Sequence, residues 1–151
     1  MSVQSVGVAV IAGWILAGVS CAASGPAPAQ PTNDQTWSVT FRMSGGLAGL
    51  DRGLEVSSSG AATATDRIRR QRETGQVPRD DLMALGRLVA AAISTEAAGP
   101  DSCRDCFEYD IDITSPGRHV TVHVNDVSLS SSNAAPLITL LRRLQDRLLS
   151  G

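Results

Sequence analysis

The chain has 151 residues and a formal net charge of −2 at pH 7, from 13 basic and 15 acidic side chains. This length suits one domain with a modest core. The near balance of charge excludes a strong field for nucleic acid or for an anionic membrane surface, so we do not expect a nucleic acid as partner.

The N-terminal residues have the pattern of an export signal. Val6 to Val19 form an uncharged, mostly apolar run, which is too short to span a bilayer comfortably and is typical of the central part of a signal peptide. Ser20-Cys21 follows and resembles a bacterial lipobox, in which the cysteine is acylated and becomes the new N-terminus. We therefore expect a signal peptide over residues 1–20, a lipid anchor on Cys21 that holds the protein at a membrane, and export to the cell envelope or secretion. The alternative is an ordinary signal peptide cleaved at Ala27-Pro28-Ala29.

Residues 21–36 are rich in alanine, proline, serine and glutamine and have no apolar periodicity. Such a segment cannot bury enough apolar surface to fold, so we interpret it as a tether. A proline-rich tether advances about 3 Å per residue and can hold the following domain well away from a membrane.

The first folded element is a strand followed by a glycine-rich loop. From Trp37 to Met43, apolar and polar residues alternate with the period of a strand that buries one face. A shorter strand follows from Gly53 to Ser57. The loop between them consists of Ser44, Gly45, Gly46, Leu47, Ala48, Gly49 and Leu50. Its glycines permit positive φ and keep the loop thin, while its two leucines form an apolar tip that either caps the edge of the core or is offered to a partner.

The middle of the chain predicts a hairpin and a helix. Residues 61–76 contain threonines at strand spacing, which predicts an extra hairpin; a short charged helix over Asp66 to Glu73 is the alternative. Pro78-Arg79-Asp80-Asp81 is a helix start, because proline is tolerated in the first turn and acidic residues favour the positive end of the helix dipole. Apolar residues then recur on one helical face until Gly99-Pro100 ends the helix.

The C-terminal third predicts a second hairpin and a second helix. Phe107 to Ile113 and Val120 to Val124 alternate as strands around a turn at Ser115 to Arg118. We expect Val127 and Leu129 to extend the second strand. The terminal helix carries an apolar stripe formed by Leu137, Leu140, Leu141, Leu144 and Leu148.

Together these elements predict an α+β domain over residues 37–151. Two amphipathic helices can cover one face of an antiparallel sheet and leave the other face in water. The expected fold therefore has two layers, an antiparallel sheet of four or more strands with two helices packed on one face.

The run from Arg42 to Leu50, Arg-Met-Ser-Gly-Gly-Leu-Ala-Gly-Leu, is similar to the signature of the emfourin family of protealysin inhibitors. The order of elements after it is also that of the family, so the resemblance covers the whole predicted domain. It implies inhibition of thermolysin-like zinc metallopeptidases by occlusion of the active-site cleft. Family members often carry an aromatic residue where this chain has Leu47.

The sequence contains no motif of a catalytic site. His-Glu-x-x-His, Gly-x-Ser-x-Gly and the phosphate-binding loop pattern are absent, so we expect neither an enzyme nor a cofactor. His119 and His123 would lie about 13 Å apart on one face of a strand, too far to chelate one metal ion together. Pairing across the turn would place Thr114 opposite His119 and Asp110 opposite His123, so we expect a cross-strand charge pair and no metal site.

Cys103 and Cys106 have the C-x-x-C spacing of thiol-disulfide enzymes. In those enzymes the first cysteine usually begins a helix after a strand, whereas here the motif follows a predicted helix and precedes a predicted strand. If Cys21 carries lipid, these two cysteines remain as one pair, and an exported protein rarely keeps a stray thiol. We therefore expect a structural disulfide, with a redox role or half of a zinc site as the alternatives.

These observations lead to one functional hypothesis and one alternative. The hypothesis is a protein inhibitor whose loop from Ser44 to Leu50 binds a zinc metallopeptidase. A leucine on a narrow loop suits the apolar pocket that enzymes of the thermolysin type offer to the residue just after the scissile bond. The alternative is an envelope-tethered binding module that has the same fold and does not inhibit proteases.

Overall fold

The computed structural model describes residues 36–93, 103 and 105–151. The expected signal peptide over residues 1–20, the expected lipid site at Cys21 and all but the last residue of the expected tether lie outside the described residues. Among the described residues, no helix is both long enough and apolar enough to cross a bilayer.

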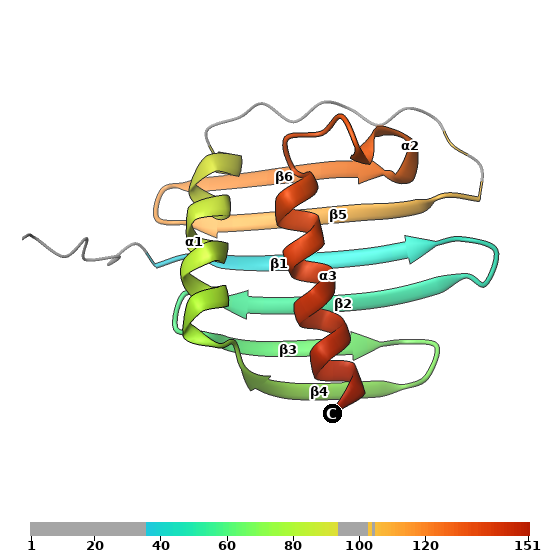
Figure 1. The fold of residues 1–151 in the computed structure, drawn as a ribbon, viewed down its shortest axis with the longest axis horizontal. Coiled ribbons are helices and arrows are strands. Elements are labelled where there is room, and N and C mark those ends of the chain that lie inside the picture. The colour runs from blue at the N-terminus through green and yellow to red at the C-terminus, as the bar shows by residue number, and fades with distance from the viewer. Residues whose placement is uncertain (1–35, 94–102, 104) are drawn as a thin grey trace, which may run out of the picture. The chain divides into compact units, whose positions relative to one another are not determined.

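Six antiparallel strands form a single sheet in the order β4-β3-β2-β1-β5-β6 (Figure 1). The strands are β1 (Ser38–Gly45), β2 (Leu50–Ser57), β3 (Ala61–Asp66), β4 (Gln71–Gln76), β5 (Phe107–Ser115) and β6 (Arg118–Asn125). Two hairpins, β1–β2 and β3–β4, follow one another along the chain, and a third, β5–β6, joins the sheet at the free side of β1. The pairing of β1 with β5 therefore joins two parts of the sheet that are far apart in sequence.

Alternation along the strands separates the two faces of the sheet. In β1, Val39, Phe41 and Met43 are buried, whereas Ser38, Thr40 and Arg42 are exposed. The same period of two recurs in the neighbouring strands, so apolar side chains gather on one face and hydroxyl and charged side chains on the other.

Helices α1 (Arg79–Ile93) and α3 (Ala135–Ser150) cover the apolar face (Figure 1). Leu85 and Val89 of α1 are buried, and five residues of the leucine-rich stripe of α3 are buried or packed against the core. The two helices are also joined to each other, because Asp81 of α1 accepts hydrogen bonds from Arg143 at 2.6 Å and from Arg147 at 2.9 Å. The predicted two-layer α+β fold with helices on one face is confirmed.

The expected hairpin at residues 61–76 is confirmed as β3 and β4, and the alternative of a charged helix over Asp66 to Glu73 is wrong. The side chain of Asp66 accepts the backbone N–H of Arg69 at 2.9 Å, which closes a tight turn after β3. Arg70 then has a φ of 54°, a left-handed conformation that a continuous helix does not contain.

The expected extension of β6 through Val127 and Leu129 is also wrong, since Asp126–Leu129 form the short helix α2. The side chain of Asn125 accepts the backbone N–H groups of Val127 and Ser128, each at 3.1 Å, and the side chain of Ser128 accepts the backbone N–H of Asn125. This reciprocal capping box outweighs the strand spacing of the two apolar residues. The pattern Asn-x-x-Ser is visible in the sequence and is the signal that could have predicted the helix start.

Candidate functional site

The glycine-rich segment is a tight turn at the end of the β1–β2 hairpin. Ser44 and Gly45 belong to β1 and Leu50 begins β2, so only the four residues from Gly46 to Gly49 form the turn. The N–H of Gly49 donates to the carbonyl of Gly46 at 3.0 Å and closes it. The predicted seven-residue loop is therefore shorter than expected, because strand pairing continues to Gly45 opposite Leu50.

Only one of the two leucines stands at the tip. The side chain of Leu47 is 95% exposed, the largest exposure among the large apolar residues that the structure describes. Leu50 is half-buried and packs against the core from the start of β2. The expectation of an apolar tip made of both leucines is corrected accordingly, and Leu50 caps the edge of the core.

The glycines of the turn are required by the fold itself. Gly45 and Gly46 have φ values of 96° and 69°, which favour glycine. A Cβ on Gly46 would lie 2.6 Å from the ring carbon Cε1 of Phe107, and a Cβ on Gly45 would collide with the carbonyl oxygen of Cys106. These two glycines let the turn pack against the start of β5, a reason for their presence that is independent of any partner.

A disulfide lies beside the turn. Cys103 and Cys106 are paired, with their Cα atoms 5.9 Å apart. The carbonyl of Cys106 accepts the N–H of Gly46 at 3.0 Å, so the disulfide-bonded segment is attached directly to the turn. Cys106 is followed at once by β5, as the structural interpretation of the pair expected.

The start of β5 is fixed from the other side by Asp126. One carboxylate oxygen accepts the N–H of Phe107 at 3.1 Å and the other accepts the hydroxyl of Tyr109 at 2.7 Å. Arg142 of α3 lies over the ring of Tyr109, 5.8 Å from its centre. Burial, with a contribution from Asp126, raises the pKa of Tyr109 to about 12, so the phenol remains a hydrogen-bond donor. Sequence reasoning missed this role of Asp126, which depends on α2.

The predicted cross-strand pairing of the histidines is confirmed. Thr114 is opposite His119 and Asp110 is opposite His123 in the β5–β6 register. The imidazole of His123 bonds Asp110 through Nδ1 and lies 2.9 Å from Glu108 through Nε2. Asp110, and then Glu108, raise the pKa of His123 despite its partial burial. No group of three or more metal-ligating side chains arranged around a common point occurs in the described part of the chain.

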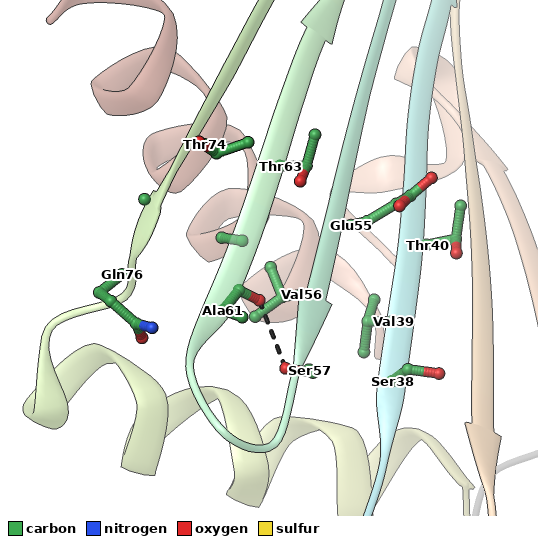
Figure 2. A pocket seen from close by; sticks show the side chains of 12 residues that line it. Ser38, Val39, Thr40, Glu55, Val56, Ser57, Ala61, Thr63, Thr74 and Gln76 are labelled. Carbon is green, nitrogen blue, oxygen red and sulfur yellow. Dashed lines mark hydrogen bonds between the residues drawn. The ribbon is translucent and has the colours of Figure 1, made fainter.

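The solvent-exposed face of the sheet carries a shallow depression at the end opposite the glycine turn. It has a volume of about 700 Å³ and lies over β1 to β4. Figure 2 shows Thr40, Glu55, Thr63 and Thr74 on this face, in the row that the strand register predicts. Hydroxyl groups and the carboxylate of Glu55 offer polar contacts there, and the lining residues include neither histidine nor cysteine.

The structure therefore brings together three of the features singled out from the sequence. The glycine turn, the disulfide and the start of β5 lie together at one end of the sheet. The pair of Asp110 and His123 lies further along β5 and β6, where Asp110 is opposite Arg42 of β1. Cys21 lies outside the described residues.

A family model described as Emfourin matches residues 41–145, which include the glycine turn, the disulfide and most of both long helices. No curated protein matches the chain.

Proposed function

Because the chain belongs to the Emfourin family, we propose that its sheet domain inhibits a zinc metallopeptidase of the thermolysin type by occluding the active-site cleft. Family membership supports an inhibitor domain over an enzyme. The protein partner would be the metallopeptidase, and the Gly46-to-Gly49 turn would be the segment that enters its cleft.

The observation that carries this proposal is the exposure of Leu47. Leu47 is 95% exposed at the tip of the turn, so its apolar surface leaves water only when a partner covers it. Such burial would stabilise the complex. Burial of one such side chain is worth about 1.5–3 kcal/mol, and the turn is already held by the hydrogen bond from the N–H of Gly46 to the carbonyl of Cys106. A leucine is also a residue type that enzymes of this class accept just after the scissile bond.

Apart from Leu47, the turn contains only small residues, which supports entry into a cleft. Ala48 and Gly49, which follow Leu47, are exposed and small. The side chain at position 47 is consequently the only bulky group on the turn. This arrangement presents one apolar side chain on a slim backbone.

The test is the inhibition constant of the purified chain against protealysin and thermolysin. Leu47→Ala should weaken inhibition about ten- to a hundredfold, since about 1.4 kcal/mol corresponds to tenfold. Met83→Ala is the matched control, because Met83 is also an exposed apolar residue but lies on α1. Both variants should melt at the wild-type temperature.

Two outcomes would decide against the proposal. Absence of inhibition by the wild-type chain would favour the alternative, a tethered binding module without inhibitor activity. A sharp drop in the melting temperature of Leu47→Ala would place the leucine in the core.

We further propose that the chain is exported and anchored through lipid on Cys21. The apolar run from Val6 to Val19 and the adjacent Ser20-Cys21 support this proposal. Mass spectrometry of the membrane fraction should find a diacylglyceryl-modified Cys21 at the N-terminus, and Cys21→Ala should release the protein from membranes. A wild-type mature form that begins at Gln30 would contradict the anchor.

A further inference from the structure

Exposed apolar side chains gather at the end of the sheet that carries the glycine turn. Among the described residues, the exposed large apolar side chains are Leu47, Ile68, Met83 and Val127. Leu47 is in the β1–β2 turn, Ile68 is 65% exposed in the β3–β4 turn, and Val127 is in α2 directly after β6. Both turns and α2 lie at the same end of the sheet in Figure 1. Leu47 is therefore not alone at this end.

The β3–β4 turn, Arg67 to Arg70, is held against the start of β2. The backbone N–H of Arg67 donates to the carbonyl of Asp51 at 2.9 Å, and its guanidinium bonds the carboxylate of Asp51 at 3.2 Å. Asp51 is two residues beyond Gly49, so the strand β2 connects the two turns. The fold fixes the distance between the β1–β2 turn and the β3–β4 turn. A partner that contacts both turns therefore does not have to order them on binding.

The same turn carries a local excess of positive charge on a chain whose net charge is −2. The side chains of Arg67 and Arg69 are 68% and 70% exposed, and Arg70 is exposed as well. The carboxylates that contact the turn, Asp51 and Asp66, also form ion pairs with arginines of β1 and β2. They therefore do not neutralise the positive charge of the turn. No ion pair of Arg70 occurs in the described residues.

We propose that the β3–β4 turn is a second contact of the inhibitor, at which Ile68 packs on an apolar surface and the arginines face an acidic rim beside the cleft of the metallopeptidase. This inference rests on the proposed function. Two strand spacings separate the two turns, about 10 Å, which equals about three residues of an extended substrate. Both turns therefore fit one cleft that binds an extended peptide.

The test measures association and dissociation rates of the full chain with protealysin and thermolysin at low and high salt. The variants are Ile68→Ala and the double variant Arg69→Gln/Arg70→Asn; asparagine is chosen because it tolerates the positive φ at position 70. The matched controls are Met83→Ala on α1 and Arg118→Gln, which starts β6 at the opposite end of the sheet. Thermal melting of every variant shows whether it is folded.

Ile68→Ala should raise the dissociation rate about tenfold. The double arginine variant should slow association several-fold at low salt and flatten its salt dependence, because exposed charges steer encounters over about a Debye length. Arg69→Lys/Arg70→Lys should restore the salt dependence, since it keeps the charges. The controls should behave as wild type.

The inference and the proposed function fail in different ways. One outcome would contradict the second contact alone. Wild type would inhibit and Leu47→Ala would weaken inhibition, while folded Ile68→Ala and the folded double variant Arg69→Gln/Arg70→Asn would inhibit as wild type does at every salt concentration. In that case the second contact is wrong and the proposed function stands. If wild type inhibits neither enzyme, the proposed function is wrong and the second contact with it.

Discussion

The ring of Phe107 occupies the space that a side chain at position 46 would need, since a Cβ on Gly46 would lie 2.6 Å from its Cε1 atom. The turn that carries Leu47 is thus shaped by a residue more than sixty positions away, at the start of β5. Substitution of Gly45 or Gly46 would therefore disturb the fold, so a loss of binding in such a variant would not identify a contact with a partner. An exposed side chain, Leu47, is the better probe of binding.

The first prediction concerns Gly46. Gly46→Ala should destabilise more than Gly49→Ala, although both positions have positive φ, at 69° and 61°. The left-handed conformation costs alanine about 1–2 kcal/mol at either site, but only Gly46 faces the ring of Phe107, and overpacking there adds about 1–3 kcal/mol. Urea unfolding measures the difference. In a Phe107→Ala background the extra cost at Gly46 should disappear; if it persists, the ring is not its cause.

The second prediction concerns the disulfide. Its cysteines are three positions apart, so the chain-entropy model assigns it about 2 kcal/mol, a small value because the closed loop is short. The double variant Cys103→Ser/Cys106→Ser should unfold at lower temperature than oxidised wild type and match wild type in reductant. Neither wild type nor the double variant should catalyse the reduction of insulin. Turnover of insulin by wild type that the double variant lacks would establish a redox role in its place.

The third prediction concerns Gln145, which faces the core from α3. The residue is fully buried, and neither its amide oxygen nor its amide nitrogen has a hydrogen-bond partner among the described residues. Leaving such groups unpaired costs about 1–3 kcal/mol, so Gln145→Met, of similar size, should raise the free energy of unfolding by about that amount. Gln71→Met is the control and should not stabilise, because the amide of Gln71 donates to the carbonyl of Leu149 at 2.9 Å. A Gln145→Met protein no more stable than wild type would show that the amide is satisfied.

The fourth prediction concerns pH. Asp110 and Glu108 raise the pKa of His123 above its ordinary value of 6.5, so the protonated imidazole stabilises the folded state. This contribution is complete below pH 6.5 and is lost as the pH rises through the folded-state pKa. The free energy of unfolding of wild type should therefore fall as the pH rises above 6.5 and through the folded-state pKa of His123, and His123→Gln should remove that part of the slope.

The matched control for the pH prediction is His119→Gln. His119 is more exposed and lies 3.5 Å from Asp112, without the second carboxylate that His123 has. His119→Gln leaves Asp110 and Glu108 in place at His123, so the part of the slope assigned to His123 should persist in this variant. Parallel profiles for wild type and His123→Gln would contradict the assignment.

Local patterns in the sequence were sufficient to predict the two layers of this fold. Period-two alternation depends on neighbours along one strand, and it correctly separated the buried and exposed faces from Val39 to Met43 and from Tyr109 to Ile113. The helical stripe of leucines in α3 is equally local and correctly predicted which side of the helix meets the sheet. The cross-strand partner of His123 followed from the length of one turn. The glycine-rich signature likewise pointed to the family that the chain belongs to.

Contacts between distant segments were decided only by the tertiary structure. The pairing of β1 with β5 brings Gly46 to Cys106 and Phe107, and the pairing of β2 with β3 brings Arg67 to Asp51. No periodicity within either segment encodes these pairings, because they depend on the order in which hairpins join the sheet. For the same reason the sequence could not reveal that Leu50 belongs to the core edge while Leu47 is exposed, or that Ile68 lies at the same end of the sheet. Residue types and faces are local properties, whereas the set of side chains that one end of the sheet presents is a property of the whole fold.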